Sequence, residues 1–135
     1  MTTFLRSETL PVREASDLLL LRQFVRECAT ELGFSVLDQT KLLTAVSELG
    51  RNTLIHGGGG TMLLETLAKD ARRGLRLTFE DKGPGIADID RAMTSGFTTK
   101  GGMGLGLSGS KRLVDEFKIV SRVGEGTRVT ATRWT

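Results

Sequence analysis

The stretch Lys100-Gly101-Gly102-Met103-Gly104-Leu105-Gly106-Leu107-Ser108-Gly109 holds five glycines in ten residues and runs into an amphipathic segment that ends near Phe117. Glycine is costly to order, so a run of it before a helix favours exposed backbone N–H groups at the helix start, which is how many proteins hold phosphate groups. The same composition is typical of a flexible surface loop. The rest of the chain has to decide between these two interpretations.

Length and composition indicate one globular domain. The chain has 135 residues, of which 39% are hydrophobic and 26% are charged. A chain of this length can bury a hydrophobic core without disulfide bonds or structural metals. Cys28 is the single cysteine, which excludes a disulfide framework, and no Cys/His pair at ligand spacing supports a zinc site. No apolar run approaches the ~20 residues of a membrane span, and the N-terminus shows no export signal. We therefore expect a single domain over residues 1–135 that acts in the reducing cytoplasm, away from membranes.

The charge pattern argues against nucleic-acid binding. The net charge is +3, and 19 basic residues are scattered among 16 acids instead of clustering. Aromatic residues make up 5% of the chain and tyrosine is absent, whereas a nucleic-acid binder is expected to interleave basic and aromatic side chains. The weak positive excess suits an anionic small ligand or an acidic protein surface.

Apolar periodicity predicts two long helices in the first half of the chain. In the first helix, apolar residues recur at three- and four-residue steps up to Leu32. Ser16 or a neighbour is expected to cap its N-terminus, and Gly33 is expected to end it. The second helix stops at the four glycines 57–60. The predicted helices are Leu18–Leu32, about Leu37–His56, Ile86–Ala92 and Leu105–Phe117.

Strand-like runs fill the remaining parts of the chain. Pro11 is expected to end the first of them, and residues 94–102 lack periodicity and are expected to form a mobile loop. The predicted strands are Thr3–Thr9, Thr61–Ala68, Leu75–Asp81, Lys118–Val123 and Thr127–Trp134. The order β-α-α-β-β-α-α-β-β predicts an α+β fold, a two-layer sandwich with helices on one face of a mostly antiparallel mixed sheet.

Polar residues of the second predicted helix share one face. Glu48, Asn52 and His56 follow one another at four-residue steps, beside the apolar stripe and not opposite it. This pattern is typical of a solvated helix face, but a carboxylate one turn from a carboxamide also suits phosphoryl transfer. There, the amide oxygen binds Mg²⁺ and the carboxylate orients or deprotonates the attacking hydroxyl or water. His56 fits a helix end or a packing role better than a catalytic one.

Two glycine-containing turns are ambiguous by themselves. Asp81 comes at the end of a predicted strand, before Gly83-Pro84-Gly85, and is typical of an Asx turn. Alternatively, the glycines let a flat ligand approach the backbone while the carboxylate accepts hydrogen bonds from an exocyclic amine. The stretch Gly124-Glu125-Gly126-Thr127 is what a tight hairpin needs in any protein.

Residues 104–109 also match the pattern G-x-G-x-x-G of dinucleotide-binding folds. That fingerprint requires a buried strand just before the glycines, and residues 96–100 do not form one. Only 26 residues follow Gly109, too few for further crossover units of a doubly wound sheet. We therefore reject the dinucleotide interpretation, and the Gly-Lys-Ser/Thr ending of a phosphate-binding loop is absent as well.

Taken in order, the ambiguous signals resemble the sequence boxes of the GHKL ATPase superfamily, which includes gyrase, Hsp90, histidine kinases and MutL. The boxes are Glu48-x-x-x-Asn52, Asp81-x-Gly83-x-Gly85, Gly102-x-Gly104-x-Gly106-Leu107 and Gly124-x-Gly126-Thr127. The resemblance covers essentially the whole chain and implies the Bergerat ATP-binding fold.

Finer details are similar to one branch of that superfamily, the small bacterial serine kinases and anti-sigma factors. These details are the run 52–55 before four glycines, Phe97-Thr98-Thr99 before the glycine stretch, and Arg133-Trp134 near the C-terminus. They look most like the RsbT-type switch kinases of the stressosome.

The resemblance implies a role for each matching residue. Glu48 would be the general base for a protein serine or threonine hydroxyl, and Asn52 would ligate Mg²⁺ on the phosphates of ATP. Asp81 would bind the adenine amino group with support from Thr127, and residues 87–100 would form a lid. The further nucleotide contacts implied are Gly83, Gly85, Ile86, Lys100, Gly101, Gly102, Met103, Gly104, Leu105, Gly106 and Leu107.

Lys100 departs from the small residues expected at its position, and it either reaches a terminal phosphate or is a solvated lid charge. The implied function is an ATP-dependent serine/threonine-protein kinase that phosphorylates a STAS-domain partner and whose release switches a downstream regulator such as a PP2C-type phosphatase. The alternative is an anti-sigma factor that sequesters a sigma factor, with kinase activity secondary. A histidine kinase is disfavoured because His56 is the only histidine.

Overall fold

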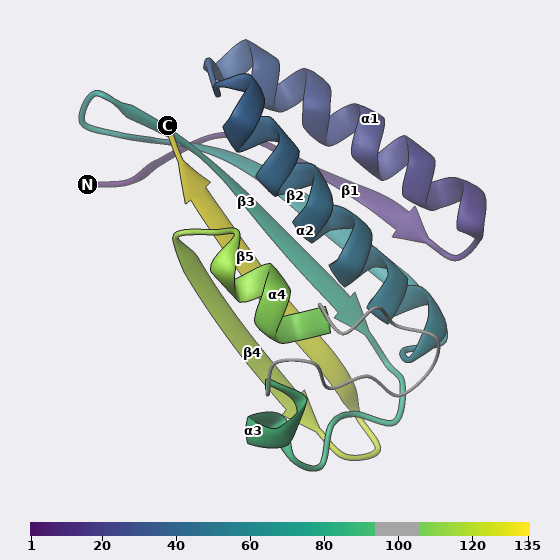
Figure 1. Cartoon of the computed structure of the whole chain (residues 1–135). Coiled ribbons are helices and arrows are strands. Elements are labelled where there is room, and N and C mark those ends of the chain that lie inside the picture. Colours follow the sequence, from purple (N-terminus) through teal and green to yellow (C-terminus); the bar gives the residue numbers. More distant parts are fainter. Residues whose placement is uncertain (94–105) are drawn as a thin grey trace.

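One five-stranded sheet with helices on one face makes up the fold (Figure 1). The computed structural model describes residues 1–93 and 106–135. The sheet order is β1-β2-β3-β5-β4, and every pairing formed by those residues is antiparallel. The strands are β1 (Thr3–Val12), β2 (Gly60–Lys69), β3 (Arg72–Asp81), β4 (Glu116–Arg122) and β5 (Gly126–Trp134), and the helices are α1 (Ala15–Leu32), α2 (Val36–Ile55), α3 (Ile89–Ala92) and α4 (Gly106–Arg112). The predicted α+β two-layer architecture is confirmed.

The two long helices have well-defined ends. The cap of α1 is Glu14 and not Ser16, because the Asp17 carboxylate accepts hydrogen bonds from the backbone N–H groups of Arg13 and Glu14 at 2.9 and 3.0 Å. The helix ends at Gly33 with φ of 89°, as its sequence predicts. Helix α2 begins at Ser35, whose hydroxyl accepts from the N–H of Asp38 at 3.1 Å.

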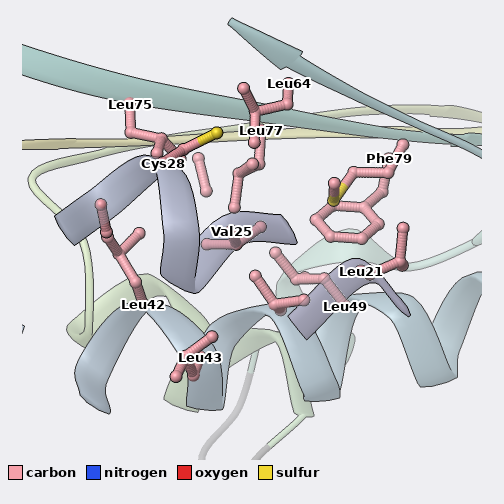
Figure 2. Close-up of a cluster of buried hydrophobic side chains, with 14 of the residues drawn as sticks. Leu21, Val25, Cys28, Leu42, Leu43, Leu49, Leu64, Leu75, Leu77 and Phe79 are labelled. Carbon is pink, nitrogen blue, oxygen red and sulfur yellow. The ribbon is translucent and has the colours of Figure 1, made fainter. Parts of the chain in front are cut away.

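The hydrophobic core lies between this helical layer and the sheet. Figure 2 shows side chains of α1 and α2 meeting those of the strands, and their burial is the main force that holds the layers together. The predicted inward face of α2 is confirmed, since Leu42, Val46, Leu49 and Thr53 are buried. The labelled core residues are Leu21, Val25 and Cys28 of α1, Leu42, Leu43 and Leu49 of α2, and Leu64, Leu75, Leu77 and Phe79 of the sheet.

A second row of mainly apolar residues crosses the opposite face of the sheet, at the end where both termini lie (Figure 1), and its member on the edge strand, Phe4, is 56% exposed. Phe4, Leu67, Gly74 and Trp134 are successive partners across β1, β2, β3 and β5. Leu67 is only 1% exposed although alternation along β2 directs it away from the helices. A Cβ on Gly74 would come within 2.7 Å of the Trp134 ring, so the indole packs on the strand itself. We call these four residues the far row.

The first strand is longer than its sequence suggests. It continues through Pro11, which pairs with Thr61, to the fully buried Val12. A central strand pairs with a neighbour on each side, and proline has no N–H to donate to such a ladder. Strand β1 lies at the edge of the sheet, where one side of its backbone has no strand partner, so proline is accepted there. The prediction that Pro11 ends this strand is therefore wrong.

The helix predicted up to Phe117 is too long. Helix α4 ends at Arg112, and Phe117 belongs to β4, where it pairs with Ala131. In β4, Phe117 and Ile119 alternate with exposed residues, so strand pairing overrides the helical spacing seen in the sequence.

Two shorter segments also differ from their predictions. The helix predicted from Ile86 starts at Ile89 instead, with Asp88 as its cap. The turn predicted over residues 69–74 shrinks to two residues, because Lys69 already pairs with Arg72. The predicted mobile loop at 94–102 lies outside the described residues, and none of the described helices is long and apolar enough to cross a membrane.

Candidate functional site

A cavity of about 510 Å³ lies between the C-terminal half of α2 and the adjoining ends of β3 and β5. Its volume is in the range of ~300–1,000 Å³ that is typical of small-molecule sites. Both its walls carry residues that the sequence singles out. The predicted site residues that line it are Glu48, Asn52, Asp81, Gly85, Ile86, Gly106, Leu107 and Thr127.

The helical wall of the cavity presents Glu48 and Asn52. They lie one turn apart on α2 and are half-buried, beside the buried residues Leu49 and Thr53. The backbone oxygen of Asn52 accepts hydrogen bonds from the N–H groups of His56 and Gly57 at 3.0 and 3.1 Å. The helix end is thus closed by backbone groups, and Glu48 and Asn52 both line the cavity.

The sheet wall presents Asp81 and Thr127. They are direct partners across the β3–β5 ladder, so their Cβ atoms are about 5 Å apart. Alternation from the buried Phe79 and Val129, which are likewise partners, turns both polar side chains towards the helical layer. The register therefore places a carboxylate and a hydroxyl side by side, opposite α2.

Glycines at the end of α2 fix the position of the Asp81 carboxylate. Its Oδ1 accepts a hydrogen bond from the N–H of Gly83 at 2.9 Å. A Cβ on Gly57 would overlap the Asp81 carboxyl group, and one on Gly83 would lie 2.7 Å from the Gly57 Cα. Gly83 itself does not line the cavity. The structure thus places Gly83 behind Asp81, in the backbone contact that orients this carboxylate.

The segment at Gly85 is docked on the β4–β5 turn. The N–H of Gly124 donates to the Pro84 oxygen at 2.8 Å, and a Cβ on Gly85 would overlap the Arg122 oxygen. Gly85 has φ of 77°, which side chains disfavour, so both space and conformation require glycine there. The Gly-Pro-Gly turn and the second hairpin form one unit at the edge of the cavity.

Ser121 is a residue of this unit that the sequence analysis missed. Its hydroxyl lies 2.8 Å from the Ile86 N–H, 3.1 Å from the Gly126 oxygen and 2.8 Å from the Thr127 hydroxyl. The available signal was a serine at the third inward position of β4, after Phe117 and Ile119.

Other lining residues were missed because nothing in their spacing marks them: Arg51 adds charge to the cavity, and Phe79 and Val129 add apolar surface. Asp88 and Arg91 also add charge, and both fall within residues 87–100, the segment expected to form a lid.

His56 ends α2 and also lines the cavity. The predicted nucleotide contacts Lys100, Gly101, Gly102, Met103, Gly104 and Leu105 lie outside the described residues.

Arg133 of β5 connects the start of α2 to the residue that follows α4. Arg133 donates to the Asp38 carboxylate at 2.6 Å and to the Leu113 oxygen at 2.9 Å. The hydrogen bond from Arg133 holds the pKa of Asp38 below its usual range. The helix that carries Gly106 and Leu107 is thereby tied to the helix that carries Glu48.

Comparison with known proteins supports one family. Residues 37–134 match the family model described as histidine kinase-, DNA gyrase B-, and HSP90-like ATPase. The serine/threonine-protein kinase RsbT of Bacillus subtilis (strain 168) is 47% identical over 118 residues, which are 87% of this chain and 89% of that protein. The anti-sigma F factor of Thermoanaerobacter sp. (strain X514) is 33% identical over 118 residues, 84% of this chain and 82% of that protein.

A solved structure shares the fold. The crystal structure of the RsbU and RsbW domains of a Mycobacterium tuberculosis protein matches with a TM-score of 0.63 at 22% identity. The match covers 96% of this chain and 32% of the other, so the chain spans about a third of that larger protein.

Proposed function

Because the chain belongs to the family of histidine kinase-, DNA gyrase B- and HSP90-like ATPases, we propose that it is an ATP-dependent kinase that phosphorylates a serine or threonine of a partner protein. The observation that carries this proposal is one cavity with Glu48 and Asn52 on its helical wall and Asp81 and Thr127 on its sheet wall. The choice of a kinase is supported by the 47% identity to serine/threonine-protein kinase RsbT.

The sheet wall suits the adenine base. Asp81 and Thr127 offer polar groups at one end of the cavity, while Ile86, Leu107 and Val129 offer apolar surface against which a flat ring can pack. In this proposal Asp81 accepts a hydrogen bond from the adenine amino group, and Gly83 keeps the carboxylate in place.

The helical wall suits the phosphates and the reacting hydroxyl. Asn52 offers one neutral oxygen, which fits Mg²⁺ because this ion keeps several waters and takes its other ligands from substrate phosphates. When bound, the ion neutralises charge that develops on the phosphates. Glu48, one turn away, accepts the proton of the attacking serine or threonine hydroxyl as general base.

Phosphate contacts at the start of α4 complete the proposed site. Gly106 and Leu107 line the cavity and face the same space as Asn52. Contacts from Lys100 to Leu105 are proposed on the sequence alone. The proposed lid over residues 87–100 is supported in its first part by Asp88 and Arg91, which line the cavity.

The proposed partner is a STAS-domain protein, and the kinase would act in the cytoplasm as a switch whose release engages a downstream regulator such as a PP2C-type phosphatase. The experiment is to mix the purified chain with radiolabelled ATP, Mg²⁺ and the STAS protein encoded nearest to it. We expect label on a serine or threonine of that protein. Tight ATP binding without any transfer would contradict the kinase assignment.

A second candidate function is sequestration of a sigma factor, favoured by the 33% identity to an anti-sigma F factor. Capture of a stoichiometric sigma factor by the tagged chain, with no phosphate transfer to the STAS protein, would favour this alternative. Phosphate transfer without sigma capture would favour the kinase.

A further inference from the structure

We infer that Ser121 is a positioning residue that fixes the direction of the Thr127 hydroxyl, so that the sheet wall accepts hydrogen bonds and selects an amino group over a carbonyl at position 6 of a purine. This inference rests on the proposed function, since it takes the cavity as the site of a purine nucleotide. It concerns a side chain that lies behind the cavity and does not line it.

Three short contacts converge on the Ser121 hydroxyl. The N–H of Ile86 donates to it at 2.8 Å, and an N–H cannot do otherwise. The backbone oxygen of Gly126 lies 3.1 Å away and can only accept. The Thr127 hydroxyl, at 2.8 Å, can either donate or accept.

Counting protons decides the direction of the third contact. A serine hydroxyl has one proton, and the Gly126 oxygen requires it. All three contacts are hydrogen bonds at the same time only if Thr127 donates its proton to Ser121. A half-buried network is favoured when every member is satisfied, because a polar group left there without a partner loses its hydrogen bonds to water and gains none in return.

This direction leaves only lone pairs of Thr127 for the cavity. Its partner across the ladder, Asp81, also presents an acceptor, since its Oδ1 already takes the Gly83 N–H. Two acceptors about 5 Å apart at Cβ therefore face one end of the cavity. An amino group, or a water that it holds, can donate to them, whereas a carbonyl oxygen would meet lone pairs on both.

The contacts of Ile86 strengthen the assignment. Ser121 holds the N–H of Ile86, a lining residue, and the Thr127 hydroxyl at the same time, so it couples the edge segment to the polar end of the cavity. The purine would thus lie beside Ile86 and Thr127, which are both held by the Ser121 hydroxyl. Loss of the Ser121 hydroxyl should therefore change the selectivity for the base, while the apolar contacts of the purine should change less.

The test compares binding of ATP and inosine triphosphate, which differ at position 6 and in the proton at N1. We expect wild type to prefer ATP by about 100-fold or more, because a site built for one hydrogen-bonding group rejects its opposite. In Ser121→Ala the Thr127 proton becomes free to turn towards the ligand. We expect the preference to fall about tenfold, in titrations followed by calorimetry.

Matched variants separate positioning from general loss of structure. Val120→Ala alters the neighbouring residue of β4, which points to the other face, and should leave the preference unchanged. Ser121→Thr keeps the hydroxyl and should keep the preference. In a Thr127→Val background, Ser121→Ala should have no further effect on the preference, because the hydroxyl it orients is gone.

Each outcome is decisive. Equal weakening of both nucleotides by Ser121→Ala, with the preference intact, would assign Ser121 a structural role and overturn the inference. If Ser121→Ala does not fold, the wild type still tests the idea, because binding inosine triphosphate as tightly as ATP would overturn it. A wild-type chain that binds neither nucleotide would instead overturn the proposed function.

Discussion

The two ends of the sheet differ in how much side-chain volume they carry. At the cavity end, the chain turns through glycine-rich segments at 57–60, 83–85 and 124–126, and backbone groups meet directly. In the far row, Phe4, Leu67 and Trp134 cover the strands with side chains, and Arg76 lies 4.9 Å from the Phe4 ring centroid. The cavity end carries little side-chain volume, whereas in the far row large side chains lie over the strands and Leu67 is almost completely buried.

This contrast implies that residues important for stability and residues important for activity lie at different ends of the same strands. Strand β3 runs from Gly74 in the far row to Asp81 in the cavity. Changes at its far end should alter the free energy of unfolding and leave the chemistry intact, whereas changes at the cavity should do the reverse.

The largest effect is expected from Glu48→Gln at the cavity end. The amide keeps the size of the side chain but does not accept the proton of the attacking hydroxyl. Phosphate transfer should fall by about 100-fold or more, with ATP affinity and melting temperature unchanged. Single-turnover transfer to the partner protein measures this, and an unchanged rate would place the base elsewhere.

The next effect is expected from Leu67→Ala in the far row. Truncating a buried leucine leaves a space that strands cannot close, so unfolding should become easier by about 2–4 kcal/mol. Urea titration measures the loss. ATP affinity of the folded protein should stay within about twofold, and a large change there would show that the two ends are coupled. Leu63→Ala, on the same face of β2 but only half-buried, is the matched control.

A smaller effect is expected from Asn52→Ala. If the carboxamide holds Mg²⁺, the variant should lose about tenfold in nucleotide affinity when Mg²⁺ is present and little when it is absent. Titration with and without EDTA measures both. If wild type binds the nucleotide equally tightly with and without Mg²⁺, the role assigned to Asn52 is refuted.

The smallest effect is expected from Asp38→Asn, at the ion pair between α2 and β5. Because the folded pKa of Asp38 is depressed, its pairing stabilises the fold above the ordinary value of about 4 and is lost as pH falls through the lower folded pKa. The melting temperature of the variant should therefore lie about 1–3 °C below wild type at pH 7, and this difference should disappear as the pH falls through the lowered pKa of Asp38. A gap independent of pH would show that charge is not its cause.

Much of the fold could be predicted because local signals agree with tertiary contacts. Gly33 ends α1 as expected, and Leu42, Val46 and Leu49 of α2 are buried as their spacing predicts. The errors occur where pairing overrides local pattern. Pro11 is accepted because β1 is an edge strand, and Phe117 joins a ladder with Ala131 although its spacing also fits a helix.

The candidate site was predictable where one element holds both residues, as with Glu48 and Asn52. The pairing of Asp81 with Thr127 depends on a register between strands 46 residues apart in sequence, which periodicity does not contain. Ser121 was missed for the same reason. Its partners, Ile86 and Thr127, come from two other segments, and the alternation of β4 alone does not name them.

Labelling of Cys28 can measure local opening of the fold. It is the single thiol of the chain, it is 2% exposed on α1 under the sheet, and burial raises its pKa, so the native state should resist alkylation. Reaction then requires α1 to lift away, and the labelling rate counts how often this happens. Comparing the labelling rate with and without nucleotide would show how far an occupied cavity reduces the opening of α1, with no dye attached and no residue changed.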